Sequence, residues 1–156
     1  MTLTKLRTKV LKLLCEHSFF SGYKIITEYP GAIRTLPVKQ PILVIGIDRV
    51  ELTAGAMGGY FGEIENYVPT GPYTEITLRF DFLLPHSLDF PADLAEELFS
   101  CLFAPLSAEK LWCDTISHDK AAMANRQRFF LSLTALLNSQ NTDDDTSVSD
   151  IIIRKV

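Results

Sequence analysis

The feature that most constrains the fold is a run of strict alternation in the middle of the chain. Apolar side chains occupy every second position from Ile76 to Leu84, and mostly polar ones stand between them. Because successive side chains of a β-strand point to opposite faces, this period of two predicts a long strand with a core face and a solvent face. A similar run covers residues 126–138, and we expect it to pair as a hairpin with a strand over residues 111–118.

Two other segments have the spacing of amphipathic helices. The first starts near Thr2 or Thr4, and its apolar stripe consists of Leu3, Leu6, Val10, Leu13 and Leu14. The second follows Pro91, ends at Pro105, and buries Leu94, Leu98, Cys101 and Leu102. A short strand is expected within residues 23–29. Residues 42–52 are apolar on both alternating sets, with Ile42, Val44, Val50 and Leu52 on one side and Leu43, Ile45 and Ile47 on the other, which predicts a strand covered on both faces. The expected fold is α+β: a mostly antiparallel sheet of four to five strands with two helices packed against it.

The chain of 156 residues is long enough to bury a core without disulfides, and we expect one α+β domain over residues 1–138. Residues 139–156 differ sharply in composition. A polar, acidic tether that contains Asp143–Asp145 leads to the aliphatic segment Ile151–Val156. Such a β-branched segment is poorly solvated alone, so we expect it to add to a sheet edge, either in its own domain or in a neighbouring copy.

Residues 54–72 form a second unusual segment, with five Gly and two Pro among scattered aromatic residues, and they form either a long loop or a wide hairpin excursion. Loops of this length are usually functional or disordered, and the aromatic residues indicate that this one docks against another surface. Its glycines, Gly55, Gly58, Gly59 and Gly62, match neither the dinucleotide fingerprint nor a phosphate loop.

The chemistry-bearing residues do not assemble into a catalytic or metal-binding motif. Three cysteines without a CxxC pair fit neither a disulfide framework nor a zinc site, and they suit a reducing compartment. The three histidines stand apart, so no metal and no cofactor is expected. Cys113 lies near Asp114, His118 and Asp119, but we interpret it as a small buried hydrophobic residue rather than a nucleophile.

Charge is distributed unevenly. Residues 1–50 contain eight Lys and Arg against three Asp and Glu, whereas residues 51–156 contain seven against sixteen, for a net charge of −4. An acidic chain without a basic stripe is a poor candidate for sequence-specific nucleic-acid binding, and unlike ends suit head-to-tail contact between copies.

Apolar runs fall short of a membrane span, and Lys12 and Glu16 interrupt the first helix, which we interpret as cytosolic rather than as a targeting segment.

The order of expected elements resembles that of the tail terminator proteins of long-tailed bacteriophages, also called tail-completion or tail-to-head joining proteins. The resemblance covers about residues 3–138. It is carried by the opening helix around Leu6–Leu14, the strand YTEITLRFDFLL, the helix PADLAEELFSCLF, and the closing pair LWCDTISHD and NRQRFFLSLTALLN. The tether and the terminal segment IIIRKV lie outside it.

The resemblance implies a structural protein of the virion tail and neck, assembled in the host cytoplasm, and not an enzyme. Copies would form a hexameric ring that caps the tail tube protein, offers a docking surface to the head-tail connector protein, and surrounds the path of the DNA. A closed ring needs unlike patches that meet around the circle. For these patches the candidates are Met57, Tyr60 and Phe61 in the loop and Ile151, Ile152 and Ile153 in the terminal arm. Ordinary core packing is the competing interpretation of each.

Two other classes remain open at this stage. The chain could be another tail or neck component, such as a tube subunit, which would stack into open helical arrays instead of one closed ring. It could also be a small α+β enzyme or ligand-binding protein, which would place polar groups with shifted pKa values around a closed cavity.

Overall fold

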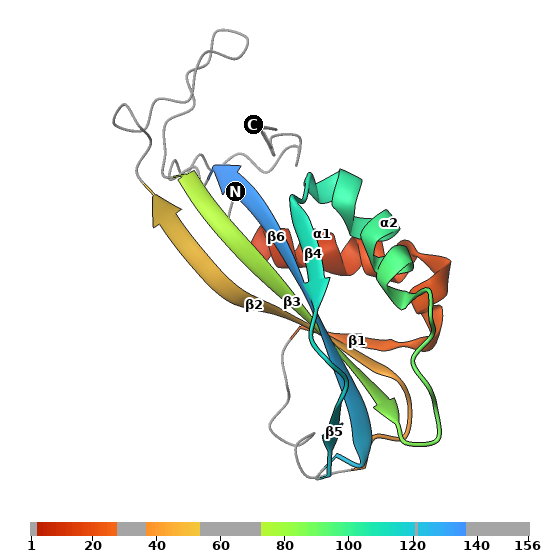
Figure 1. The fold of residues 1–156 in the computed structure, drawn as a ribbon. Coiled ribbons are helices and arrows are strands. Elements are labelled where there is room, and N and C mark those ends of the chain that lie inside the picture. Colours follow the sequence, from red (N-terminus) through yellow and green to blue (C-terminus); the bar gives the residue numbers. More distant parts are fainter. Residues whose placement is uncertain (1–2, 28–36, 54–72, 121, 137–156) are drawn as a thin grey trace, which may run out of the picture.

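A computed structural model of the chain describes residues 3–27, 37–53, 73–120 and 122–136. These residues form an α+β fold with two helices and a mixed, mostly antiparallel open sheet of six strands (Figure 1). In chain order the elements are helix α1 (Leu3–Glu16), 3-10 helix η1 (Ser18–Gly22), strands β1 (Lys24–Ile26), β2 (Ile42–Thr53) and β3 (Tyr73–Pro85), helix α2 (Leu94–Leu106), and strands β4 (Lys110–Cys113), β5 (Ser117–Asp119) and β6 (Ala124–Leu136). The predicted fold class is therefore confirmed.

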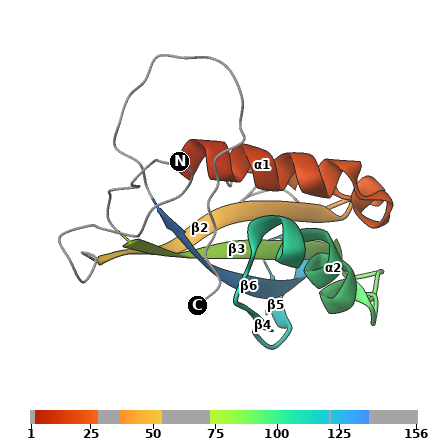
Figure 2. The same cartoon turned by 90° about the horizontal axis from the view of Figure 1, so that it is seen from above.

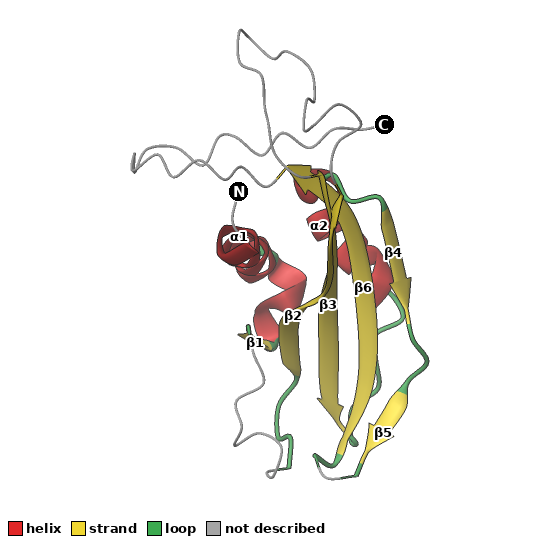
Figure 3. Ribbon diagram, turned by 90° about the vertical axis from the view of Figure 1, so that its left-hand side faces the viewer, coloured by secondary structure: helices red, strands yellow, loops and turns green. Residues whose placement is uncertain are grey.

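Three long strands make up the body of the sheet. The strand order is β1, β2, β3, β6, β4, and β5 pairs with β6 beyond the end of β4 (Figure 3). Strand β3 lies in the centre, antiparallel to β2 on one side and to β6 on the other, and β1 is parallel to β2 over three residue pairs. In the described part of the chain, one edge of the sheet is formed by β1 and by the part of β2 beyond Val44, and the other edge is formed by β4 and β5.

Both helices pack on one face of the sheet. Leu6, Val10 and Leu14 of α1 are buried there with the apolar stripe of α2, against the alternating residues of β3 and β6. Figure 2 shows α1 lying along β2. The two helices also contact each other through a hydrogen bond, because Lys9 Nζ donates to the Pro105 carbonyl oxygen at 3.0 Å. The apolar faces predicted for these four elements are thus confirmed, and they form one core.

The predicted facing of β2 is wrong in its second half. The sequence places Val50 and Leu52 on the side of Ile42 and Val44, but the register with β3 shifts between Ile47 and Arg49. This β-bulge inserts one residue, so every later side chain changes face. Val50 and Leu52 lie on the helix-covered side and are 37% and 62% exposed, so β2 is covered on both faces only near its start.

The second face of the sheet is not uniformly exposed either. A small apolar cluster covers the end of this face near Pro85, and it consists of Val38, Ile42, Val44, Leu83, Ala122 and Ala124. The backbone N–H of Val38 donates to the Ala122 carbonyl oxygen at 2.8 Å, which holds the segment before β2 against the turn between β5 and β6. Asp81 and Leu83, both expected on the solvent face of β3, are therefore buried.

The remaining differences between the predicted and the observed fold concern where the helices and strands begin and end. The strand expected over residues 111–118 is split into β4 and β5, which brings the sheet to six strands instead of four to five. Helix α2 starts at Leu94, later than Pro91 suggested, and includes Pro105, because the left-handed Ser107 ends the helix. The expected loop over residues 54–72 and the arm over residues 139–156 lie outside the described residues.

Candidate interaction surface

The face of the sheet that the helices leave uncovered is the candidate functional surface, and we call it the open face. Alternation and strand register assign its side chains. They are Arg49 and Glu51 of β2, Glu75, Thr77, Arg79 and Asp81 of β3, Arg126, Arg128, Phe130, Ser132 and Thr134 of β6, and Lys110 and Trp112 of β4. Because long regular strands carry these residues, the surface is held in place by the sheet.

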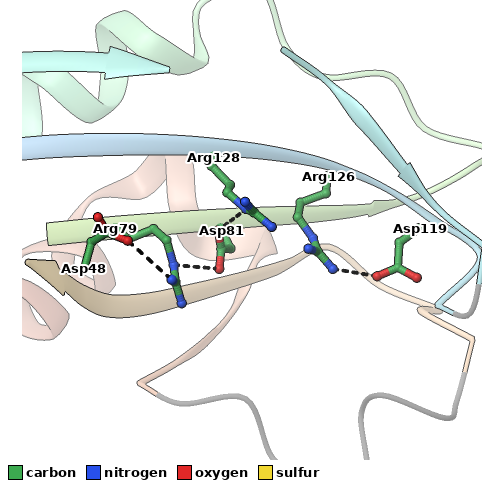
Figure 4. Close-up of polar contacts among 6 residues, drawn as sticks. All are labelled: Asp48, Arg79, Asp81, Asp119, Arg126 and Arg128. Carbon is green, nitrogen blue, oxygen red and sulfur yellow. Dashed lines mark hydrogen bonds and ion pairs between the residues drawn. The ribbon is translucent and has the colours of Figure 1, made fainter. Parts of the chain in front are cut away.

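A buried carboxylate organises the centre of the open face (Figure 4). The side chain of Asp81 is only 3% exposed, and it lies between two arginines from the strand itself and from β6. Arg79 Nε donates to Asp81 Oδ2 at 3.1 Å, and Arg128 Nε forms an ion pair with Asp81 Oδ1 at 3.4 Å. A buried charge needs such partners, so Asp81 fixes the orientation of both guanidinium groups.

The network continues to both sides. Arg79 also forms an ion pair with Asp48 at the bulge of β2, with 3.6 Å between Arg79 Nη1 and Asp48 Oδ1. Gly46 lies beside this guanidinium group, and a Cβ atom there would stand 3.4 Å from Arg79 Nη2, at van der Waals contact. Toward the other end, Arg126 donates to Asp119 Oδ2 at 2.5 Å. Three arginines and three aspartates therefore neutralise one another across the sheet (Figure 4).

Beside this network lies a partly exposed aromatic pair. Trp112 of β4 stacks on Phe130 of β6, with ring centroids 5.5 Å apart and planes inclined by 17°. Lys110 Nζ stands 5.2 Å from the centroid of the indole ring, a cation–π geometry. Trp112 remains 37% exposed, although large aromatic residues are usually buried and are enriched at the centres of protein interfaces. A flat, preorganised patch of this kind suits contact with another protein.

Among the described residues, the two groups with displaced pKa values, Tyr23 and Cys101, lie in the helix-side core. Burial raises the pKa of Tyr23, with a further contribution from Asp93, and burial together with Glu97 raises the pKa of Cys101. Both shifts favour the neutral form, so the phenol and the thiol remain protonated at neutral pH.

The structure exposes one cysteine that the sequence predicted as buried, and it brings two histidines together. Cys113 is exposed, not buried as expected, because β4 is an edge strand. His86 and His118 stack on each other at 4.1 Å, and His118 Nδ1 lies 3.2 Å from Asn125 Oδ1. Within the described residues, no group of three or more His, Cys, Asp and Glu could hold a metal ion. None of the helices in that part of the chain has the length and apolar character to cross a membrane.

The residues predicted as subunit contacts fall outside the described residues. This applies to Met57, Tyr60 and Phe61 and equally to Ile151, Ile152 and Ile153. The pair of Trp112 and Phe130 and the burial of Asp81 were not predicted from the sequence. The chain contains a single Trp, which was one available signal, but its partner follows only from the register of β4 on β6.

Comparison with known proteins adds no family to this picture. No protein-family model matches the chain, and no curated protein matches it.

The network gives a first testable prediction. We expect Asp81→Asn to lower the free energy of unfolding by about 1–3 kcal/mol, because it removes the buried charge that both arginines contact. The half-exposed arginines can partly turn to solvent, which keeps the loss moderate. Urea denaturation, monitored by tryptophan fluorescence, measures this change in the free energy of unfolding. Asp48→Asn, at a carboxylate that is 40% exposed, is the matched control and should change stability by less than about 0.5 kcal/mol.

Proposed function

We propose that the chain is a structural subunit that terminates the tail of a bacteriophage or a phage-like particle. Copies close into a ring on the tail tube and present a docking surface to the head-side connector. The resemblance in element order over residues 3–138 supports this proposal, and the fold agrees with the α+β layout on which the resemblance was based. Self-association is the activity, and no bond is made or broken.

The observation that carries the proposal is the difference between the two edges of the sheet. One edge presents Trp112 and Lys110 of β4, and the other presents Val50 and Leu52 of β2 beside charged residues. Strands β3 and β6 separate the two, so the edges face away from each other. A closed ring of identical copies needs unlike patches on opposite sides of the subunit, each of which meets the other on the next copy.

The charge distribution is compatible with a ring around DNA. The net charge is −4, and the arginines of the open face are engaged by aspartate or glutamate side chains. A weakly repulsive lumen allows a polyanion to slide instead of binding to the wall. The tail tube and the connector are the protein partners that follow from this role.

The mass of the purified particle in solution tests the proposal. Size-exclusion chromatography with light scattering should give six times the chain mass of 17.5 kDa, and negatively stained fields should show closed rings. Open stacks of indefinite length would instead favour a tube subunit, and a monomer at micromolar concentration would overturn ring formation altogether.

A substitution at the β4 edge tests the role of the aromatic patch. We expect Trp112→Ala to weaken subunit association by about thirtyfold, the effect of losing a central interface aromatic residue. Leu88→Ala is the control, because Leu88 is exposed to a similar degree but lies in the turn after β3, away from both edges. Equal association constants for the two variants would exclude the Trp112 patch from the interface.

A further inference from the structure

Among the residues that the structure describes, most of β2 has no strand on its outer side. Strand β1 pairs with Ile42–Val44 only, and in the described part of the chain no strand pairs with the outer side of β2 beyond Val44. After the bulge, Arg49–Thr53 continue as a regular ladder with β3. The outward N–H and C=O groups of such an edge are free to pair with an additional strand.

The side chains along this edge specify what the additional strand should look like. On the helix side, Val50 and Leu52 are exposed apolar groups. On the open face, Glu51 stands directly opposite Glu75 in the register of β2 and β3, and like charges at such positions are unfavourable. Arg49 forms an ion pair with Glu51, which offsets only part of this charge. The edge therefore suits a strand that is apolar on one face and carries a cation on the other.

The C-terminal segment of the chain has this pattern. In a strand, Ile151 and Ile153 share one face and Arg154 lies on the other. We propose that Ile151–Val156 of a neighbouring copy adds to β2 as an edge strand. Ile151 and Ile153 then lie on the side of Val50 and Leu52, and Arg154 lies on the side of Glu51. This inference rests on the proposed ring and identifies one contact within it.

The tether is long enough for the terminal segment to reach a neighbouring copy. Strand β6 ends at Leu136, which pairs with Tyr73, and Tyr73 pairs with Thr53 at the end of β2. Within one copy the two ends are thus separated by two strand spacings, about 10 Å, which three or four extended residues would span. Residues 137–150 provide fourteen, with a reach of up to about 46 Å. That reach is greater than the diameter of a domain of this size, about 35 Å.

Cross-linking between copies tests the location. The background variant carries Cys15→Ser and Cys113→Ser, which remove the exposed thiols and leave the buried Cys101. One tagged copy carries Leu52→Cys and a second, differently tagged copy carries Ile153→Cys, and the two are co-expressed. A short bismaleimide should give a covalent dimer. Ile152→Cys is the control, because its side chain lies on the opposite strand face, and it should cross-link several-fold less.

Each result of this experiment has a defined meaning. A chain that carries both Leu52→Cys and Ile153→Cys should form covalent oligomers. If it forms only an internally linked monomer, the segment pairs within its own copy and the proposal is overturned. If a ring forms in solution but no cross-link appears, strand addition at β2 is wrong while the ring remains. If the unmodified chain is monomeric, the ring itself fails.

A charge exchange tests the register independently. Glu51→Arg and Arg154→Glu should each weaken subunit association by about fivefold, and the two together should restore it. Lys155→Glu is the matched control, because Lys155 lies on the other face of the segment. Adding Glu51→Arg to Lys155→Glu should not restore subunit association. A double variant that associates no better than either single variant would overturn the pairing of Arg154 with Glu51.

Discussion

Replacing Phe80 by alanine is expected to lower the free energy of unfolding by about 3–5 kcal/mol. Phe80 lies at the middle of the central strand, fully buried, and it is in register with Ile45 of β2 and Phe129 of β6. Neighbouring strands on both sides hold the backbone in place, so the surrounding core cannot collapse into the space that the ring leaves. The midpoint and slope of guanidinium denaturation measure the loss.

The exposed Phe99 of α2 offers a matched control for this experiment. It stacks on Phe103 at 4.2 Å but remains 44% exposed, so Phe99→Ala removes the same atoms from a site that is already hydrated. Its expected cost is about 1 kcal/mol or less. Equal costs for the two substitutions would show that the face of β3 toward the helices is not the core.

Removal of residues 139–156 is the second large effect, and it acts on assembly. Among the described residues, the two buried clusters lie between Leu6 and Ala135, and we expect the truncated chain to unfold within about 1 kcal/mol of the full chain. The ring, in contrast, should lose one strand pairing at every interface. We expect subunit association to weaken at least thirtyfold, which corresponds to the loss of about 2 kcal/mol per contact. Light scattering against concentration measures it.

A full-length variant separates the terminal strand from its tether. The triple substitution Ile151→Ser, Ile152→Ser and Ile153→Ser keeps the chain length and the acidic residues but removes the apolar strand face. It should weaken assembly as much as the truncation does. An unchanged oligomer mass together with a large fall in thermal stability would assign residues 139–156 to the folding of their own copy.

Local periodicity predicted much of the fold correctly. The faces of α1, β3 and β6 follow from the spacing of apolar residues, and Leu6, Phe80 and Leu131 are buried as that spacing requires. The prediction failed where an element depends on a distant partner. The bulge after Ile47 reverses the faces of Val50 and Leu52, and it arises in the pairing of β2 with β3.

The candidate surface was less accessible to sequence reasoning than the core. Asp81 looks like an ordinary solvent-facing residue of an alternating strand, yet Arg79 and Arg128 enclose it and the segment of Val38 covers its end of the sheet. Trp112 meets Phe130 only through the register of two strands. A charge or an aromatic ring in the sequence does not show which side chains will surround it.

The sequence by itself determined the fold class, the apolar faces of the helices and long strands, and the polar tether with its apolar end. These are properties of short windows, because side-chain direction repeats every two or 3.6 residues. The tertiary structure alone decided the strand order, the buried aspartate, the stacked aromatic pair and which strands lie at the sheet edges in the described part of the chain. The physical reason is that each of these features requires segments far apart in the chain to pair in one register, and no single window contains that register.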